Sequence, residues 1–242
     1  MKKYLFAFVF ISATCLVVFA QKNMKPWTEW SQKDAMKMLN DSAWGQTQTE
    51  TNTNEMFFSP TARSSSNSGG QGATNQATSV NFRIRFLSSR PIRQAFARTI
   101  LLQQKEADSQ KPEQLKAMEA QLKTFAEQKS PEWVVVAVSF DSTDQRFSNS
   151  AMQVFNSSNV GILQNNTYLE VKGGKRIFLK QYIAPINDGM GAKFVFPRVV
   201  DNQPIVTKDG GDIRFYSEVS KDIKLNMRFK LADMMYDGQL EF

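Results

Sequence analysis

The stretch WVVVAVSF at residues 133–140 is apolar at nearly every position. A strand with one face in water alternates apolar and polar residues, whereas a strand that is covered on both faces does not. The four valines favour extended backbone, because β-branched side chains fit a pleated surface. The stretch is therefore expected to be a central strand, with helices or a second sheet on one face and the rest of the core on the other.

Other segments alternate in the manner of half-buried strands. VNFRIRF (80–86) places Val80, Phe82, Ile84 and Phe86 on one face and Asn81, Arg83 and Arg85 on the other. Residues 223–231 alternate in the same way, and Gly173-Gly174 is a strong hairpin signal between predicted strands 167–172 and 175–184. In all, about nine strands are expected, with few β-α-β alternations.

Two helical patterns lie between the predicted strands 80–86 and 133–140. Each begins near a proline, Pro91 or Pro112, and each repeats apolar residues at intervals of three and four. They predict an antiparallel helical hairpin over residues 90–128. The fold class expected is α+β, a mostly antiparallel β-sandwich-like domain with this hairpin inserted between two strands.

The N-terminus has the pattern of an export signal. Lys2 and Lys3 precede an apolar run, and residues 18–20 (VFA) supply small residues at the positions that a signal peptidase reads. Residues 1–20 are interpreted as a signal peptide and residues 21–242 as a single domain. Within that domain, the Ser/Gly-rich segment 59–79 is expected to be a disordered loop, because it carries no large apolar residue.

Cysteine and histidine usage excludes several kinds of chemistry. The chain has no His, and its one cysteine, Cys15, lies in the predicted signal peptide. Without that peptide, disulfides, His- or thiolate-based metal sites and Ser-His-Asp or Cys-His catalysis are all excluded. No cofactor is expected. Carboxylate, Lys, Tyr and Ser chemistry remains open.

Three tryptophans cluster near the start of the predicted domain. Trp27 and Trp30 lie in a segment, 27–40, that resembles a short amphipathic helix capped by Ser31 and Asp34, and Trp44 follows. Exposed tryptophans can stack on sugars, but a short helix needs a buried face to be stable, and Trp is usually highly buried. Burial in the core is therefore the preferred interpretation, with a sugar or partner surface as the alternative.

The chain carries a formal charge of +7, and several cations fall on the polar side of predicted strands. If those strands share a sheet, they form a basic, partly aromatic surface that suits an anionic envelope polymer or a lipid head group. The alternative is an ordinary solvated face on which cations discourage edge pairing. The candidate residues are Arg83, Arg85, Arg176, Lys180, Arg228 and Lys230, together with Lys224.

Carboxylates offer a different candidate site. Asp141 and Asp144 directly follow the predicted central strand, a position where loops often carry function. A glycosidase needs two carboxylates about 5–10 Å apart, and the sequence leaves the second one open among Glu170, Asp188, Asp212 and Glu218. The simpler interpretation of residues 141–144 is a turn that caps a helix.

Four segments are distinctive in wording and order: WTEWSQKDAMKMLNDSAWGQTQTET (27–51), VNFRIRFLSSRPIRQAFAR (80–98), YIAPINDGMGAKFVFPR (182–198) and NMRFKLADMMYDGQLEF (226–242). In combination they resemble an uncharacterised family of secreted proteins from soil bacteria, chiefly acidobacteria. The resemblance spans nearly all of the chain after the signal peptide, except the Ser/Gly-rich segment. It implies a bacterial, exported protein, and it implies no activity and no catalytic residue.

Together these features predict an exported protein of the periplasm or the extracellular space. The expected function is a non-catalytic binding or structural module of the bacterial envelope, with a carboxylate-dependent hydrolase acting on polysaccharide as the alternative. Nucleic acid is not an expected partner, and membrane contact is expected only through an uncleaved leader.

Overall fold

The predicted central strand is the middle strand of a five-stranded sheet. β3 (Trp133–Ser142) pairs with β2 (Thr78–Phe86) on one side and with β7 (Ala192–Pro197) on the other, and the strand order is β1-β2-β3-β7-β6. β1 spans Gly45–Asn52 and β6 spans Gln181–Ile183. Val136 and Val138 face the interior, and Ala137 on the opposite face is also buried. The two-faced apolar pattern therefore has cover on both sides, as predicted.

The computed structural model describes residues 25–52, 78–106, 112–128, 132–143 and 145–242. The predicted signal peptide (1–20) and most of the predicted loop 59–79 lie outside the described residues. Two residues of that loop prediction are wrong, because Thr78 and Ser79 begin β2, where they pair with Asn52 and Thr51 of β1. Antiparallel pairing to β1 extends the strand beyond its apolar residues.

A second, four-stranded sheet packs against the first. Its order is β11 (Lys224–Lys230), β10 (Asp212–Glu218), β4 (Thr167–Val171) and β5 (Lys175–Phe178), again with antiparallel pairing. Aromatic rings join the two inner faces: the Phe86 and Phe229 ring centroids lie 4.9 Å apart, and those of Phe194 and Phe215 lie 5.3 Å apart. These contacts give the α+β, sandwich-like fold that the sequence predicts.

The predicted strand 175–184 divides between the two sheets. β5 ends at Phe178 in the four-stranded sheet, and β6 begins at Gln181 in the five-stranded sheet. At the crossing, the Leu179 N–H donates to Thr167 O and the Lys180 N–H donates to Val195 O. One extended segment therefore forms a corner of the sandwich, which its alternation pattern does not reveal.

A side-chain amide bridges one open side of the sandwich. Gln48 on β1 donates from Nε2 to Lys224 O at 2.8 Å and accepts the Asn226 N–H at Oε1, also at 2.8 Å. β1 and β11 are the edge strands of their sheets. The amide thus forms hydrogen bonds with two backbone groups at the edge of β11, as a neighbouring strand would.

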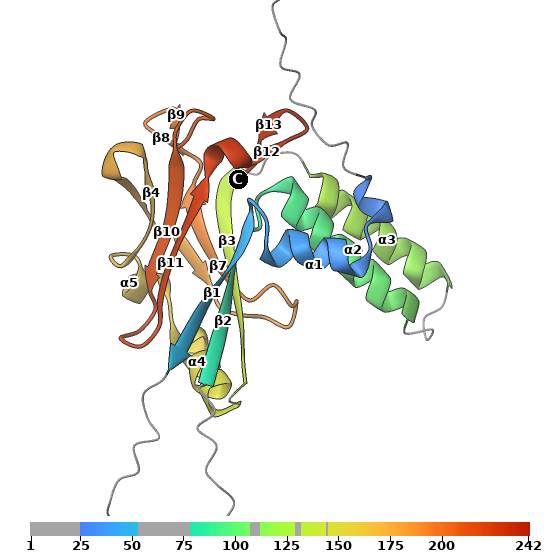
Figure 1. Ribbon diagram of the computed structural model, residues 1–242, viewed down its shortest axis with the longest axis horizontal. Helices are drawn as coiled ribbons and strands as arrows, with labels where there is room; N and C mark the ends of the chain where they lie inside the picture. Colours follow the sequence, from blue (N-terminus) through green and yellow to red (C-terminus); the bar gives the residue numbers. More distant parts are fainter. Residues whose placement is uncertain (1–24, 53–77, 107–111, 129–131, 144) are drawn as a thin grey trace, which may run out of the picture.

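The helices that precede β3 in the chain form a third layer beside the five-stranded sheet (Figure 1). α1 (Gln32–Asn40) packs on α2 (Arg90–Glu106), and α2 forms the predicted hairpin with α3 (Pro112–Glu127). The remaining elements are η1 (Trp27–Glu29), α4 (Gln145–Ser157), α5 (Val160–Leu163), η2 (Lys172–Gly174), β8 (Val199–Val200), β9 (Gln203–Pro204), η3 (Leu231–Asp233), β12 (Met235–Tyr236) and β13 (Gln239–Leu240).

The three tryptophans are buried, which confirms the core interpretation. The predicted helix 27–40 is two elements, because Trp30 adopts an extended conformation before the Ser31–Asp34 capping box starts α1. The Trp44 Nε1–H donates to Glu241 O at 2.8 Å, and its ring packs edge-on against Tyr236. Trp44 therefore joins the start of β1 to the C-terminal end of the described chain, whereas η1, which contains Trp27, packs on α2.

Candidate functional site

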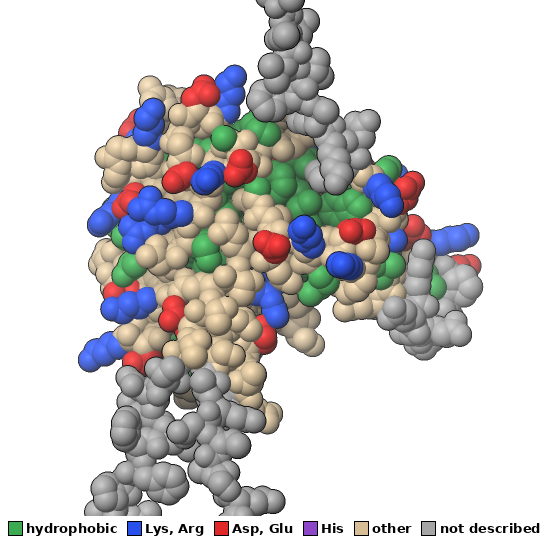
Figure 2. All heavy atoms as spheres, viewed as in Figure 1, with side chains coloured by type: hydrophobic (Ala, Val, Ile, Leu, Met, Phe, Trp, Pro, Cys, Tyr) green, Lys and Arg blue, Asp and Glu red, His purple; other side chains and the backbone are tan. Residues whose placement is uncertain are grey.

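The outer face of the four-stranded sheet gathers cations and aromatic rings. We call it the basic–aromatic face. Strand register places on it Tyr168 and Glu170 of β4, Arg176 and Phe178 of β5, Asp212, Arg214, Tyr216 and Glu218 of β10, and Lys224, Asn226, Arg228 and Lys230 of β11. Figure 2 shows Lys and Arg side chains gathered at the left of the view, over β10 and β11.

Three aromatic side chains form a row across this face. Phe178 lies opposite Tyr168, and Tyr168 lies opposite Tyr216. The two tyrosine rings stack at 5.1 Å, and Phe178 meets Tyr168 edge-on at 6.0 Å. Tyr168 is only 7% exposed, whereas Phe178 is 49% exposed and is one of the largest apolar groups in contact with water. The outer end of the row is thus an accessible ring.

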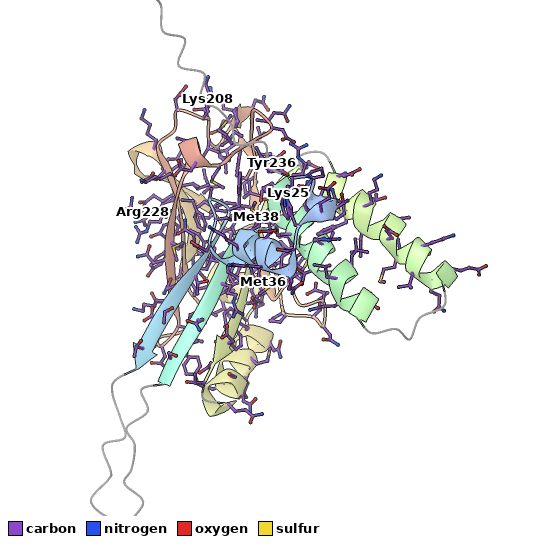
Figure 3. All side chains as sticks on the ribbon, turned by 45° about the vertical axis from the view of Figure 1, so that its right-hand side comes forward. Lys25, Met36, Met38, Lys208, Arg228 and Tyr236 are labelled. Carbon is purple, nitrogen blue, oxygen red and sulfur yellow. The ribbon has the colours of Figure 1, made fainter. Side chains whose placement is uncertain are left out.

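A row of charged residues runs beside the aromatic row. Arg176, Glu170, Arg214 and Arg228 lie at successive paired positions of β5, β4, β10 and β11. Glu170 approaches Arg176 at 3.7 Å and Arg214 at 3.5 Å, and Arg214 also donates from Nε to Asn226 Oδ1. Arg228 has no ion-pair or hydrogen-bond partner among the described residues. It lies on the outer side of β11 (Figure 3).

Cation–π contacts join the two rows. The Arg176 guanidinium lies 4.4 Å from the Tyr168 ring centroid, and that of Arg214 lies 5.4 Å from the Tyr216 centroid. Guanidinium groups over aromatic rings are held in place without losing their charge. The face therefore presents cations in fixed positions beside the exposed Phe178 ring.

A hollow of about 310 Å³ lies at one end of the basic–aromatic face. It lies between the Gly173-Gly174 turn, which joins β4 to β5, and the Gly210-Gly211 turn, which precedes β10. Glu170, Arg214 and Arg228 of the charged row contribute to its lining. This concave part of the face therefore coincides with two of its arginines.

Arg176, Arg228 and Lys230 lie on the basic–aromatic face, together with Lys224. Arg83, Arg85 and Lys180 do not, because the predicted single sheet is two sheets. Arg83 lies on the outer face of the five-stranded sheet, where it pairs with Asp141 at 2.6 Å. Lys180 lies at the corner between β5 and β6.

Arg85 departs furthest from the predicted solvent face. It is 4% exposed and lies beneath α1, donating to Leu39 O, Asn40 Oδ1 and Ser139 Oγ at 2.7–2.9 Å. Burial lowers the pKa of its guanidinium from its ordinary value to about 10. Arg85 is therefore an interior residue that joins the C-terminal end of α1 to the sheet. It cannot contact a ligand on the surface.

Arg214 and Tyr216 are central to the face and were not among the predicted site residues. Both alternate with buried residues along DIRFYSE (212–218), which is the signal that could have identified them. Their importance comes from β4 and β11, the neighbours of β10, which place Arg228 and Tyr168 beside them. The alternation within residues 212–218 does not show which strands pair with β10.

The candidate carboxylates are dispersed over the molecule. Asp141 pairs with Arg83, Asp188 with Lys193 at 2.6 Å, and Glu218 with Lys224 at 3.5 Å. Only Glu170 and Asp212 share a site, the hollow, and Asp144 lies outside the described residues. Within the described ranges, no three His, Cys, Asp or Glu residues form a group that could hold a metal ion.

Comparisons with protein-family models, with curated proteins and with solved structures found no match for this chain. No helix in the described part of the chain is both long and apolar enough to cross a membrane. The site must therefore be interpreted from its own geometry.

Proposed function

We propose that the protein is an exported, non-catalytic binding module of a bacterial envelope, and that its basic–aromatic face holds an anionic polysaccharide. The export signal at residues 1–20 and the resemblance to secreted acidobacterial proteins support the location. The cations and aromatic rings of the basic–aromatic face support an anionic polysaccharide as the ligand.

The observation that carries this proposal is the pairing of two arginines. Arg214 lies directly opposite Arg228 on neighbouring strands, although like charges at paired positions destabilise a sheet. Glu170 and Asn226 compensate Arg214, but Arg228 has no such partner among the described residues. Five cations and three carboxylates occupy the outward positions of this face. An anionic ligand would supply the missing compensation.

The aromatic row favours a sugar among the anionic ligands. The exposed Phe178 ring provides an apolar surface on which a pyranose ring can stack, and Arg176 lies on the same strand two residues away. A sugar ring that carries a carboxylate can use both features at once. The carboxylates on the face mostly form ion pairs with its cations, which supports binding in preference to hydrolysis.

The test is binding to polygalacturonate, an acidic polysaccharide, measured at low and at high salt. Binding is expected to weaken as salt rises, and Arg228→Gln and Phe178→Ala are each expected to weaken it about fivefold or more. Arg83→Gln is the matched control, because Arg83 is a partly exposed arginine on the other sheet. Its affinity should equal that of the wild type.

Four results would overturn the proposal. Absence of binding, or equal affinities for Arg228→Gln, Phe178→Ala and Arg83→Gln, would remove the basic–aromatic face from consideration. Binding to anionic phospholipid vesicles without binding to the polymer would assign a lipid head group instead. Release of reducing ends by the wild type, lost in Glu170→Gln, would establish the carboxylate-dependent hydrolase.

A further inference from the structure

The hollow at the end of the basic–aromatic face contains charges of both signs. Its charged lining residues are Glu170, Lys172, Asp209, Asp212, Arg214 and Arg228. Three are cations and three are anions, in a space of about 310 Å³. That volume falls at the lower end of the range for small-molecule sites.

Most of these charged side chains have no ion-pair partner among the residues that the structure describes. Glu170 and Arg214 lie 3.5 Å apart and neutralise each other. In the part of the chain that the structure describes, Lys172, Arg228, Asp209 and Asp212 have no ion-pair or hydrogen-bond partner for their side chains. Two unpaired cations and two unpaired carboxylates therefore border one concave space.

Glycines keep the rim of the hollow open. Gly173, Gly174 and Gly211 have φ of 80°, 77° and 77°, a conformation that favours glycine. A Cβ atom added at any of these three positions would meet no atom within 4 Å. The two turns therefore border the hollow with unfilled space beside their glycines.

A ligand with a single charge would compensate only half of this site. An anion would meet Lys172 and Arg228 but would be repelled by Asp209 and Asp212, and a cation would meet the reverse. A ligand with an ammonium group and a carboxylate can compensate both pairs at once, because each of its charges finds opposite charges in the hollow.

We propose that the hollow binds a small zwitterion of the amino-acid or peptide type. Arg228 and Lys172 hold its carboxylate, and Asp209 and Asp212 hold its ammonium group. The basic–aromatic face and the lining of the hollow share Glu170, Asp212, Arg214 and Arg228. The ligand differs in chemistry from the polysaccharide, and this inference does not depend on the polysaccharide proposal.

The test uses three dipeptide probes in NMR titrations of the purified protein. Glycylglycine carries both charges, N-acetylglycylglycine carries only the carboxylate, and glycylglycinamide carries only the ammonium group. Glycylglycine is expected to bind about fivefold or more tightly than either blocked probe. The shifted backbone signals are expected in residues 171–174 and 209–214.

Matched variants assign the two halves of the site. Arg228→Gln and Asp212→Asn are each expected to weaken glycylglycine binding about fivefold or more. Lys208→Gln and Asp222→Asn are the controls, because both residues are exposed and neither lines the hollow. Asp212→Asn also separates the two proposals, since removal of an anion should strengthen binding of polygalacturonate while it weakens binding of glycylglycine.

Three outcomes would overturn this inference. No signal shift at about 50 mM glycylglycine would mean that the hollow is not a site for this ligand class. Equal or tighter binding of either blocked probe would show that one sign of charge suffices. Tighter binding of O-phosphoethanolamine than of glycylglycine would assign a lipid-type zwitterion instead.

Discussion

Replacement of Arg85 by alanine is expected to destabilise the protein far more than the same replacement at Arg83, two residues away on β2. The two arginines have the same place in the alternation of the strand. Arg85 is buried under α1 with three hydrogen-bond acceptors, whereas the Arg83 side chain is 29% exposed and pairs with Asp141.

The magnitude follows from these contacts. Hydrogen bonds from a charged donor contribute about 2 kcal/mol each after their exchange with water is counted, and bonds made by one side chain are not simply additive. Burial disfavours the charged guanidinium and lowers its pKa. Arg85→Ala, which leaves three acceptors without their donor, should therefore lower the free energy of unfolding by about 4 kcal/mol. Arg83→Ala should lower it by at most about 1 kcal/mol, as for other exposed ion pairs.

Urea unfolding followed by circular dichroism measures both values, and Arg85→Lys serves as a further variant. Lysine keeps the charge but lacks the planar fork that reaches Leu39 O, Asn40 Oδ1 and Ser139 Oγ together, so most of the loss should remain. Hydrogen exchange of α1 amides should also rise in Arg85→Ala. If Arg85→Ala cost no more than Arg83→Ala, the burial of Arg85 beneath α1 and the reasoning above would be refuted.

Three further perturbations test other parts of the fold. Val136→Asp places a carboxylate on the fully buried inner face of β3 and should lower the free energy of unfolding in urea by about 4 kcal/mol. The control Val199→Asp, at an exposed site, should lower it by about 0.5 kcal/mol or less. Similar losses for the two variants would mean that the sheet faces are misassigned. Gln48→Ala removes the bridge to Lys224 and Asn226 and should lower the free energy of unfolding by about 1 kcal/mol. The control Gln46→Ala should lower it by less. A larger loss for Gln46→Ala than for Gln48→Ala would exclude the bridge. Burial raises the pKa of Tyr182, whose hydroxyl donates to Phe155 O, so the folded state resists its ionisation. The free energy of unfolding of the wild type, relative to that of Tyr182→Phe, should hold below about pH 9 and fall above about pH 10, where the unfolded tyrosine ionises; a pH-independent difference would contradict this assignment.

Much of the architecture could be predicted from local sequence patterns. The apolar stretch 133–140 predicted a central strand, the glycine pair 173–174 predicted a hairpin, and the spacing of apolar residues predicted the α2–α3 hairpin, all of which the structure contains. The burial of Trp27, Trp30 and Trp44 was also predictable, because tryptophan has a large apolar surface and is usually highly buried. Each of these features depends on residues that are close together in the chain.

The candidate site was only partly predictable. Alternation identified the outward residues of each strand, including Arg176, Arg228 and Lys230, but not which strands are neighbours. It therefore placed Arg83 and Arg85 with them and omitted Arg214. The opposition of Arg214 and Arg228, and the hollow between two glycine turns, require the register between β10 and β11 and between β4 and β10.

The sequence by itself determined the class of the fold, the central strand and the absence of histidine and of cysteine beyond Cys15, because composition and periodicity are properties of the chain alone. Only the tertiary structure decided which polar strand faces meet water. The outer faces of β2 and β11 have the same alternation, yet α1 covers Arg85, whereas the Arg228 side chain forms no ion pair or hydrogen bond with a described residue. The reason is physical: alternation fixes the side of a strand on which a residue lies, whereas long-range packing decides what covers that side.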